Sequence, residues 1–182
     1  NNDPERSFQP SAHRFPKPLH EIQVLYGLGR HADPYPAQEM DVDWVCGSFL
    51  LIRRATLEQV GPMDERFFTY NEDIDWCQRI TKAGWKIRYW PGARMIHIGS
   101  SASPFVRDKT SIMFRSHLTY LRKHHGIVIA ALFYLAMGFK LILAAIKQLV
   151  LWAIGRSAKH DIKLRWQRLK NFVFVQPSKS GI

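Results

Sequence analysis

The stretch that most constrains the fold is residues 64–84, where an aromatic loop leads directly into a cluster of carboxylates. Asn71 is a favourable N-cap residue, and the acidic residues that follow it suit the positive first turn of a helix. Gly84 suits the position just beyond a helix end. The sequence therefore predicts a helix over about residues 72–83, preceded by an aromatic loop.

The three carboxylates of this predicted helix fall on different faces, because each residue turns the helix by about 100°. Asp73 falls on the inward face, which it shares with Trp76, Cys77, Ile80 and Ala83. Glu72 and Asp75 fall on the opposite, solvent-facing side, where Asp75 and Arg79 form a favourable i,i+4 pair. Asp73 thus heads an apolar stripe, where it could meet a substrate hydroxyl. The alternative is that all three acids only cap the helix.

The charges are divided unevenly along the chain. Its 182 residues, 46% of them hydrophobic, suffice for one packed domain with an appendage. Residues 1–81 hold 8 Lys and Arg against 13 Asp and Glu, a net charge of −5, whereas residues 82–182 hold 18 against 2, a net charge of +16. The basic rear could meet nucleic acid, anionic lipid or a phosphorylated substrate.

The front of the chain, residues 1–40, is rich in proline and polar residues. We expect an irregular segment that covers a domain, with one short helix at the apolar patch of residues 22–28. The opening 20 residues contain no apolar stretch of the kind found in signal peptides. Cys46 and Cys77 are expected to be buried, reduced thiols, since their spacing fits neither a disulfide framework nor a zinc site.

Residues 42–52 are almost all apolar, which predicts a strand buried on both faces. Gly47 in the middle of this strand weakens it unless a backbone or a ligand approaches closely there, and a bulge is an equal alternative. A short helix over residues 55–60, stopped by Gly61 and Pro62, follows. Further strands are expected over residues 85–89 and 93–98, with a turn at Pro91 and Gly92 between them.

Two features offer weak signals for a metal. Asp41 and Asp43 have a spacing that can hold a metal bound to a diphosphate, but they precede the predicted strand rather than follow it. His97 stands at a predicted strand end before Gly and Ser, where it suits a metal ligand or a phosphate contact. A lone histidine is more often structural.

Several motifs, in this order, resemble the GT-A-fold family 2 glycosyltransferases, most closely the rhamnosyltransferase-like group. The resemblance covers about residues 41–103. The matching motifs are WVCGSFLLIRR from Trp44, VGPMDERFF from Val60, YNEDIDW from Tyr70, AGW from Ala83 and HIGSS from His97.

The resemblance implies an α/β fold that forms part of a GT-A mixed sheet, and an inverting transfer of sugar from a nucleotide-sugar to an acceptor hydroxyl. Asp73 looks like the family's general base, which must lie within hydrogen-bond reach of the attacking hydroxyl. Glu72 and Trp76 would line the acceptor side. The donor sugar would be approached by the backbone at Cys46, Gly47 and Ser48.

The family's metal site is also implied. His97 resembles the histidine that completes the diphosphate site with Mg²⁺ or Mn²⁺, which would neutralise the leaving group. The other ligands are expected in a nucleotide-binding half that precedes this portion in the family. Without that half, the chain is predicted to bind a nucleotide-sugar only weakly. The Gln-x-x-Arg-Trp motif of processive synthases does not occur, since Ile80 follows Gln78 and Arg79, which favours one or few additions.

The rear of the chain predicts a helical tail. A basic helix over residues 105–125 should end at Gly126, and thirteen uncharged residues follow it up to Phe139. A helix that spanned a membrane here would place Lys140 near its middle, which costs about 2.5–3.5 kcal/mol on insertion scales. We therefore expect interfacial or re-entrant helices. Residues 156–173 carry an apolar stripe among basic residues, which suits an anionic membrane or, alternatively, packing against the domain.

The sequence thus predicts an irregular segment over residues 1–40, an acceptor-side half of a GT-A domain over residues 41–104 and a membrane-associating tail over residues 105–182. Its acceptor would be a lipid-linked or cell-envelope glycan at the cytoplasmic face of the cell membrane. Nucleic acid is not an expected partner, because no platform of aromatic and basic residues is evident. The alternative is a non-catalytic basic membrane-binding module or a relic of a transferase.

Overall fold

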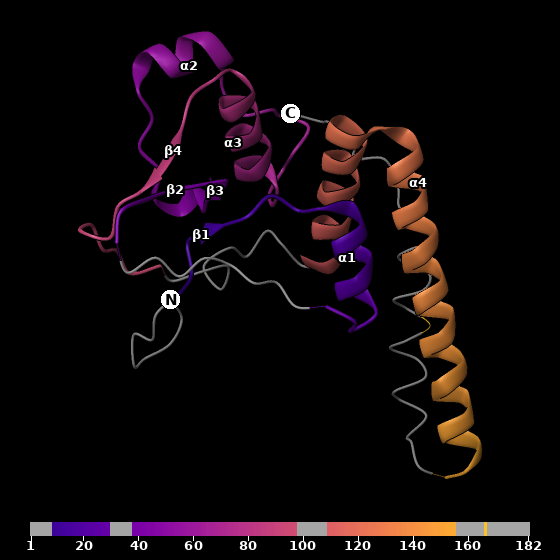
Figure 1. The fold of residues 1–182 in the computed structure, drawn as a ribbon. Helices are drawn as coiled ribbons and strands as arrows, with labels where there is room; N and C mark the ends of the chain where they lie inside the picture. The colour runs from indigo at the N-terminus through magenta and orange to yellow at the C-terminus, as the bar shows by residue number, and fades with distance from the viewer. Residues whose placement is uncertain (1–8, 30–37, 98–108, 156–165, 167–182) are drawn as a thin grey trace. The chain divides into compact units, whose positions relative to one another are not determined.

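The computed structural model describes residues 9–29, 38–97, 109–155 and Trp166. These residues form two compact units: residues up to Lys17 with residues 38–97 and 109–120, and residues Pro18–Gly29 with the chain from Leu121. The elements in chain order (Figure 1) are β1 (Ala12–His13), α1 (Pro18–Leu25), β2 (Met40–Val42), β3 (Trp44–Val45), the short 3-10 helix η1 (Gly47–Phe49), α2 (Arg54–Val60), α3 (Glu72–Lys82), β4 (Ile87–Tyr89) and α4 (Lys109–Ala153).

The described strands of the first unit form two antiparallel pairs. β1 pairs with β3, with Ala12 opposite Val45, and β2 pairs with β4, with Val42 opposite Ile87. α3 packs against β3, β4 and α2. The core of this unit includes Ala12, Val42, Phe67, Ile74, Trp76, Cys77, Ile80 and Tyr120. The unit is therefore a small α/β structure in which α3 is the central helix.

The two aspartates considered as metal ligands instead hold strands together. Asp41 forms ion pairs with Arg88 at 2.9 Å and with Lys86 at 3.1 Å, both from the strand region of β4. Asp43 accepts a hydrogen bond of 2.9 Å from the backbone N–H of Phe15, next to β1. Both carboxylates are thus occupied by contacts across the two strand pairs.

The prediction of one buried strand over residues 42–52 is wrong. The chain instead forms β3, turns through η1 and continues without regular structure to Ile52, and Leu51 is 100% exposed. An apolar run becomes a buried strand only when other layers cover both of its faces. α3 packs against β3, but residues 47–49 and Leu51 are exposed. The strand expected over residues 93–98 is likewise not formed over its described part, residues 93–97.

Helix α3 confirms the predicted helix and its end. Gly84 adopts a φ of +90°, its N–H donates to the carbonyl of Thr81, and the N–H of Trp85 donates to the carbonyl of Ile80. This pair of hydrogen bonds is the Schellman arrangement, which needs a residue that tolerates a positive φ. The predicted side-chain cap by Asn71 is wrong, because Asn71 has a φ of +63° and its side chain makes no capping hydrogen bond.

The predicted solvent-facing position of Asp75 is also wrong. Asp75 is fully buried and pairs with Arg79 at 3.1 Å, so the predicted i,i+4 pair does form, but inside the unit. The reason is that α2 and the turn after it pack on this side of α3, which places protein where solvent was expected.

The second unit joins α1 to the rear part of α4. The hydroxyl of Tyr26 donates to the carbonyl of Ala136 at 2.6 Å, and the ammonium of Lys140 donates to the carbonyl of Leu25. Gly126 has non-helical dihedral angles (φ 86°, ψ 168°) and divides α4 into two helical segments, which confirms the predicted helix end there. Apart from Trp166, the amphipathic pattern predicted over residues 156–173 lies outside the described residues.

By length and composition alone, α4 is long and apolar enough to cross a membrane: its most apolar window has a mean hydropathy of 2.3, and 11% of that window is buried. Such a helix in isolation is weak support for a span, since core helices of other proteins reach the same hydropathy.

Candidate active site

The carboxylate of Asp73 is held by two backbone N–H groups. The N–H of Gly47 donates to Oδ2 at 3.0 Å, and the N–H of Ile74 donates to Oδ1 at 2.9 Å. A Cβ atom on residue 47 would lie 3.3 Å from Cβ of Asp73, a tighter approach than most such contacts. Gly47 is therefore a point of close approach, but what approaches it is the side chain of Asp73 rather than the backbone or ligand that the sequence suggested.

The backbone that leads into α3 is in an unusual conformation. Tyr70 and Asn71 both have positive φ angles, 68° and 63°, which non-glycine residues adopt at a cost of roughly 1–2 kcal/mol each. The hydroxyl of Ser116 in α4 donates to the carbonyl of Thr69 at 2.8 Å and ties this loop from the other side. The positive φ angles of Tyr70 and Asn71 fix the path of the backbone into α3, and with it the positions of Glu72 and Asp73.

Glu72 lies half-buried beside Asp73. Burial raises the pKa of its carboxyl group, a backbone hydrogen bond opposes this, and the neighbouring charge of Asp73 adds to the rise. Its Oε2 atom is buried and has no hydrogen-bond partner among the described residues. Glu72 therefore keeps its proton to a higher pH than an exposed glutamate does, which reduces the repulsion from Asp73.

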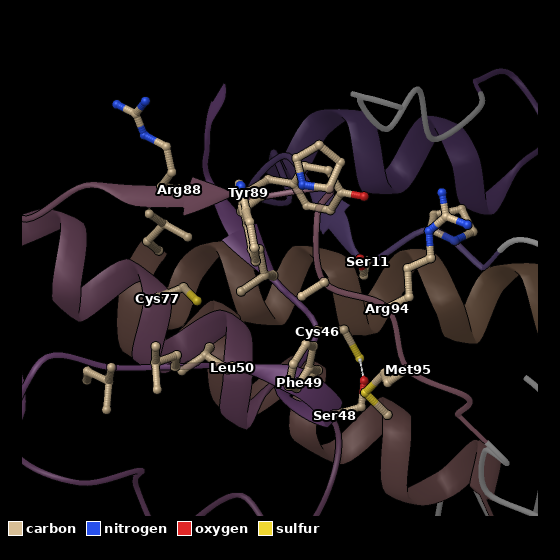
Figure 2. Close-up of a pocket in the computed structure, with 18 of the residues that line it drawn as sticks. Ser11, Cys46, Ser48, Phe49, Leu50, Cys77, Arg88, Tyr89, Arg94 and Met95 are labelled. Atoms are coloured by element: carbon tan, nitrogen blue, oxygen red, sulfur yellow. Dashed lines mark hydrogen bonds between the residues drawn. The ribbon is translucent and has the colours of Figure 1, made fainter. Parts of the chain in front are cut away.

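An open cavity of about 1120 Å³ is lined in part by residues of η1, among them Ser48 and Phe49 (Figure 2). Cys46 and Ser48 line it, and the hydroxyl of Ser48 donates to the sulfur of Cys46 at 3.3 Å. His97, Arg94 and further residues of the 85–97 stretch also line it. Asp73 does not line the cavity, but it accepts a hydrogen bond from Gly47, which lies in the chain between the lining residues Cys46 and Ser48.

The two cysteines differ. Cys77 is fully buried, and burial raises the pKa of its thiol to about 11. Cys46 is only half-buried and faces the cavity, so its predicted burial is wrong. Both are free thiols, as predicted. A thiol with so high a pKa is inert at neutral pH, which leaves Cys77 a packing residue of α3.

Three carbonyls in succession accept hydrogen bonds from side chains of α3. Arg79 donates to Val60 and to Pro62, each at 2.6 Å, and the indole N–H of Trp76 donates to Gly61 at 2.9 Å. Trp76 is 8% exposed and lies in the core. Its predicted place on the acceptor side stays a prediction. Helix periodicity does not predict these three hydrogen bonds. The only sequence feature that points to Arg79 is its i,i+4 spacing from Asp75.

The predicted metal site stays a prediction. The described residues hold no group of three or more His, Cys, Asp or Glu side chains close enough to bind a metal ion, so His97 stands there without companion ligands. These residues do not fit a metal centre by themselves, and we derive no step of the reaction through a metal.

Comparison with known proteins places this arrangement in a family. The sequence model of glycosyl transferase family group 2 matches residues 32–172. The chain belongs to this family. Membership in glycosyl transferase family group 2 implies a GT-A fold, and the mixed α/β architecture of the first unit agrees with that. The resemblance seen in the motifs is thereby confirmed.

Two curated relatives are rhamnosyltransferases by name. The chain is 34% identical over 125 residues to N-acetylglucosaminyl-diphospho-decaprenol L-rhamnosyltransferase of Mycobacterium tuberculosis, which covers 63% of the chain and 40% of that protein. It is 34% identical over 112 residues to rhamnosyltransferase WbbL of Escherichia coli K12, covering 59% and 41%. The chain thus spans about two fifths of each relative's length. No solved structure matches the chain.

Proposed function

We propose that the chain is the acceptor-side part of an inverting glycosyltransferase that moves a sugar from a nucleotide-sugar to an acceptor hydroxyl. Both relatives are named rhamnosyltransferases, which supports L-rhamnose as the sugar. One is named for a diphospho-decaprenol substrate, which supports a lipid-linked glycan of the cell envelope as the acceptor. The donor's nucleotide would bind mainly to protein outside this portion.

The observation that carries the proposal is the fixed carboxylate of Asp73. In an inverting transfer the acceptor oxygen attacks the anomeric carbon while the bond from that carbon to the diphosphate breaks. The acceptor's proton must leave at the same time, and Asp73 would accept it. Two N–H donors from different elements hold the carboxylate in one orientation, which a general base needs so that it meets the hydroxyl at hydrogen-bond distance.

Glu72 would support the acceptor rather than remove its proton. The pKa of its carboxyl group is raised by burial, and its buried Oε2 has no partner among the described residues. A half-buried carboxyl group with an oxygen left unpartnered can form a hydrogen bond with a hydroxyl of the acceptor, whereas two N–H groups hold Asp73 in one orientation. The two neighbouring acids would thereby take different roles because their surroundings differ.

The test is Asp73→Asn in the complete enzyme that contains this chain, assayed for sugar transfer. Asn keeps the size of the side chain and an oxygen for the N–H of Gly47, but it cannot take a proton. The turnover number should fall by about 10²–10⁴-fold, the usual contribution of a general base. Glu65→Gln, at an exposed carboxylate seven residues before Glu72, is the matched control and should change little. Unchanged transfer by the Asp73 variant would remove Asp73 as the base.

We also propose that the enzyme acts at the cytoplasmic face of the cell membrane, which it meets through its basic and apolar rear. The net charge of +16 over residues 82–182 and the exposed apolar side chains of α4 support this. They equally support the second candidate, a non-catalytic membrane-binding module. The Asp73→Asn variant separates the two, because a transferase loses transfer and keeps vesicle binding, whereas the module has no transfer to lose.

A further inference from the structure

The rear segment of α4, residues 127–153, has two contrasting faces. At about 100° per residue, positions seven apart stay on one side of a helix. Four such residues, Val128, Leu135, Ile142 and Leu149, are between 43% and 68% exposed. We call these four the apolar stripe. On the opposite side, Ala130, Phe133 and Gln148 are 6–8% exposed and therefore covered by protein.

The two lysines of this segment avoid the apolar stripe. Taking Leu135 as its centre, Lys140 and Lys147 lie about 140° and 120° away around the helix, both on the same flank. This flank borders the covered side, where Gln148 also lies. The apolar stripe is therefore uninterrupted by charge over the length of the segment, although the sequence itself is interrupted twice.

Helix α1 is attached to the same flank at the middle of the segment. Lys140 is the central residue of 127–153, and its ammonium donates to the carbonyl of Leu25, the last residue of α1. One helical turn earlier, Ala136 accepts the hydrogen bond of the Tyr26 hydroxyl at 2.6 Å. A cation at a helix C-terminus also meets the negative end of the helix dipole, which favours this contact.

This attachment conflicts with a transmembrane orientation. Segment 127–153 would be about 40 Å long, and its middle would fall near the centre of a hydrocarbon layer about 30 Å thick. The C-terminal end of α1 would then lie at that depth too, together with Glu21 and the exposed Gln23. Charged and polar groups are costly there, because the hydrocarbon supplies no hydrogen-bond partners.

We propose that segment 127–153 lies in the plane of an anionic bilayer, with the apolar stripe immersed and α1 carried on its water-facing side. Lys140 and Lys147 then lie on the flank that carries α1, outside the hydrocarbon. Lys140 stays bonded to the Leu25 carbonyl, and the long side chain of Lys147 can extend from this flank toward the lipid headgroups. This inference rests on the membrane association proposed above and specifies which face makes the contact.

The test measures depth residue by residue with the full chain on vesicles of phosphatidylglycerol and phosphatidylcholine. Single cysteines at the four stripe positions carry an environment-sensitive fluorophore, and Met137, Ala144 and Leu151 provide matched positions on the opposite side. Cys46→Ser removes the accessible native thiol, and fully buried Cys77 remains. Lipids with nitroxides in their acyl chains then quench each label according to its depth.

An in-plane helix gives equal, strong quenching at all four stripe positions and several-fold weaker quenching at each matched position. A spanning helix instead gives strong quenching at Leu135, Met137, Ile142 and Ala144 alike and weak quenching at Val128 and Leu151. That second pattern would overturn the in-plane orientation while leaving membrane association intact. Failure of the chain to sediment with the vesicles would overturn the membrane association itself. Blue-shifted labels without nitroxide quenching would show that a second protein copy, and not lipid, covers the stripe.

Discussion

The amide of Gly47 and the carboxylate of Asp73, 26 positions apart, are joined by a hydrogen bond of 3.0 Å across the boundary between η1 and α3. The same two residues are so close that a methyl group on Gly47 would crowd Asp73 at 3.3 Å. The glycine thus does two things for the carboxylate: it supplies an N–H donor and leaves the space in which the side chain lies.

Gly47→Ala should therefore move Asp73 more than it unfolds the protein. We expect a loss of about 1–2 kcal/mol in unfolding free energy from the crowding. The turnover number should fall by about 10–100-fold, because Asp73, the proposed base, would lose its alignment. Steady-state kinetics of the complete enzyme, with urea unfolding in parallel, measures both. Gly84→Ala is the control: it strains a φ of +90° away from Asp73, so it should lower stability and leave turnover unchanged. Equal turnover losses in both variants would refute the positioning role.

The buried pair of Asp75 and Arg79 should dominate the stability of α3. Arg79→Met leaves the fully buried carboxylate of Asp75 without its cation and removes the donors to Val60 and Pro62. We expect a loss of about 3–5 kcal/mol in unfolding free energy. Arg54→Met breaks an i,i+4 pair of similar length with Glu58, at 2.9 Å, in which both side chains are more than half exposed. That control should cost only about 0.3–0.5 kcal/mol. Similar losses in denaturant unfolding would contradict the assignment.

The effect of Glu72→Gln on the unfolding free energy should depend on pH. Because burial raises the pKa of Glu72 in the folded state, this carboxyl favours folding fully only below its unfolded pKa, about 4.5. That contribution is lost as pH rises through the folded pKa, since the carboxylate must then be charged while half-buried. The Gln variant should equal the parent near pH 4 and exceed it in unfolding free energy near pH 7. A gain that is the same at both pH values would show that the ionisation of Glu72 is not involved.

The two thiols should react at very different rates. Cys46 lines the cavity and is half-buried, so a maleimide should modify it readily at pH 8. Cys77 is fully buried with a thiol pKa of about 11, so its reactive thiolate is scarce and shielded. Mass spectrometry should find one label per folded chain and two in urea. With Cys46→Ser the folded chain should take none, and rapid labelling of that variant would place Cys77 outside the core.

Removal of the Lys140 ammonium should loosen α1. Lys140→Met deletes the donor to the Leu25 carbonyl, and because the lysine is exposed we expect a loss of about 0.5–1 kcal/mol in local stability. Amide hydrogen exchange in residues 18–25 should then quicken about 2–5-fold. Lys147→Met removes the same charge from the same flank one heptad later and should leave α1 exchange unchanged. Equal acceleration in the two variants would point to net charge, not to the contact.

The sequence was informative where local chemistry decides the structure. α3, its glycine-dependent end at Gly84, the stop at Gly126 and the family itself were all predicted from residues that act within one turn or one motif. The glycine inside an apolar run likewise marks position 47 as special, although its partner in the structure, the side chain of Asp73, was not predicted. Such signals are local, so a sequence carries them without knowledge of the tertiary fold.

The errors arose where packing between distant segments decides the structure. Asp75 was assigned to solvent because periodicity gives the faces of a helix but not what packs on each, and α2 covers that face. Leu51 was assigned to a buried strand because its apolar neighbours suggested two covering layers that the described residues do not provide. Nor does local sequence indicate that α1 docks on Lys140, 115 positions beyond the acceptor Leu25.

That last separation has a consequence for how the chain assembles. The second unit is discontinuous: α1 is synthesised early, and the helix it docks on comes more than 100 residues later. Contacts that close so long a loop form late, whereas the elements between them can fold as soon as they emerge. α1 must therefore remain undocked while the segment that carries Gly47 and Asp73 takes shape. Docking of α1 would then follow both the folding of that segment and the synthesis of residues 127–153.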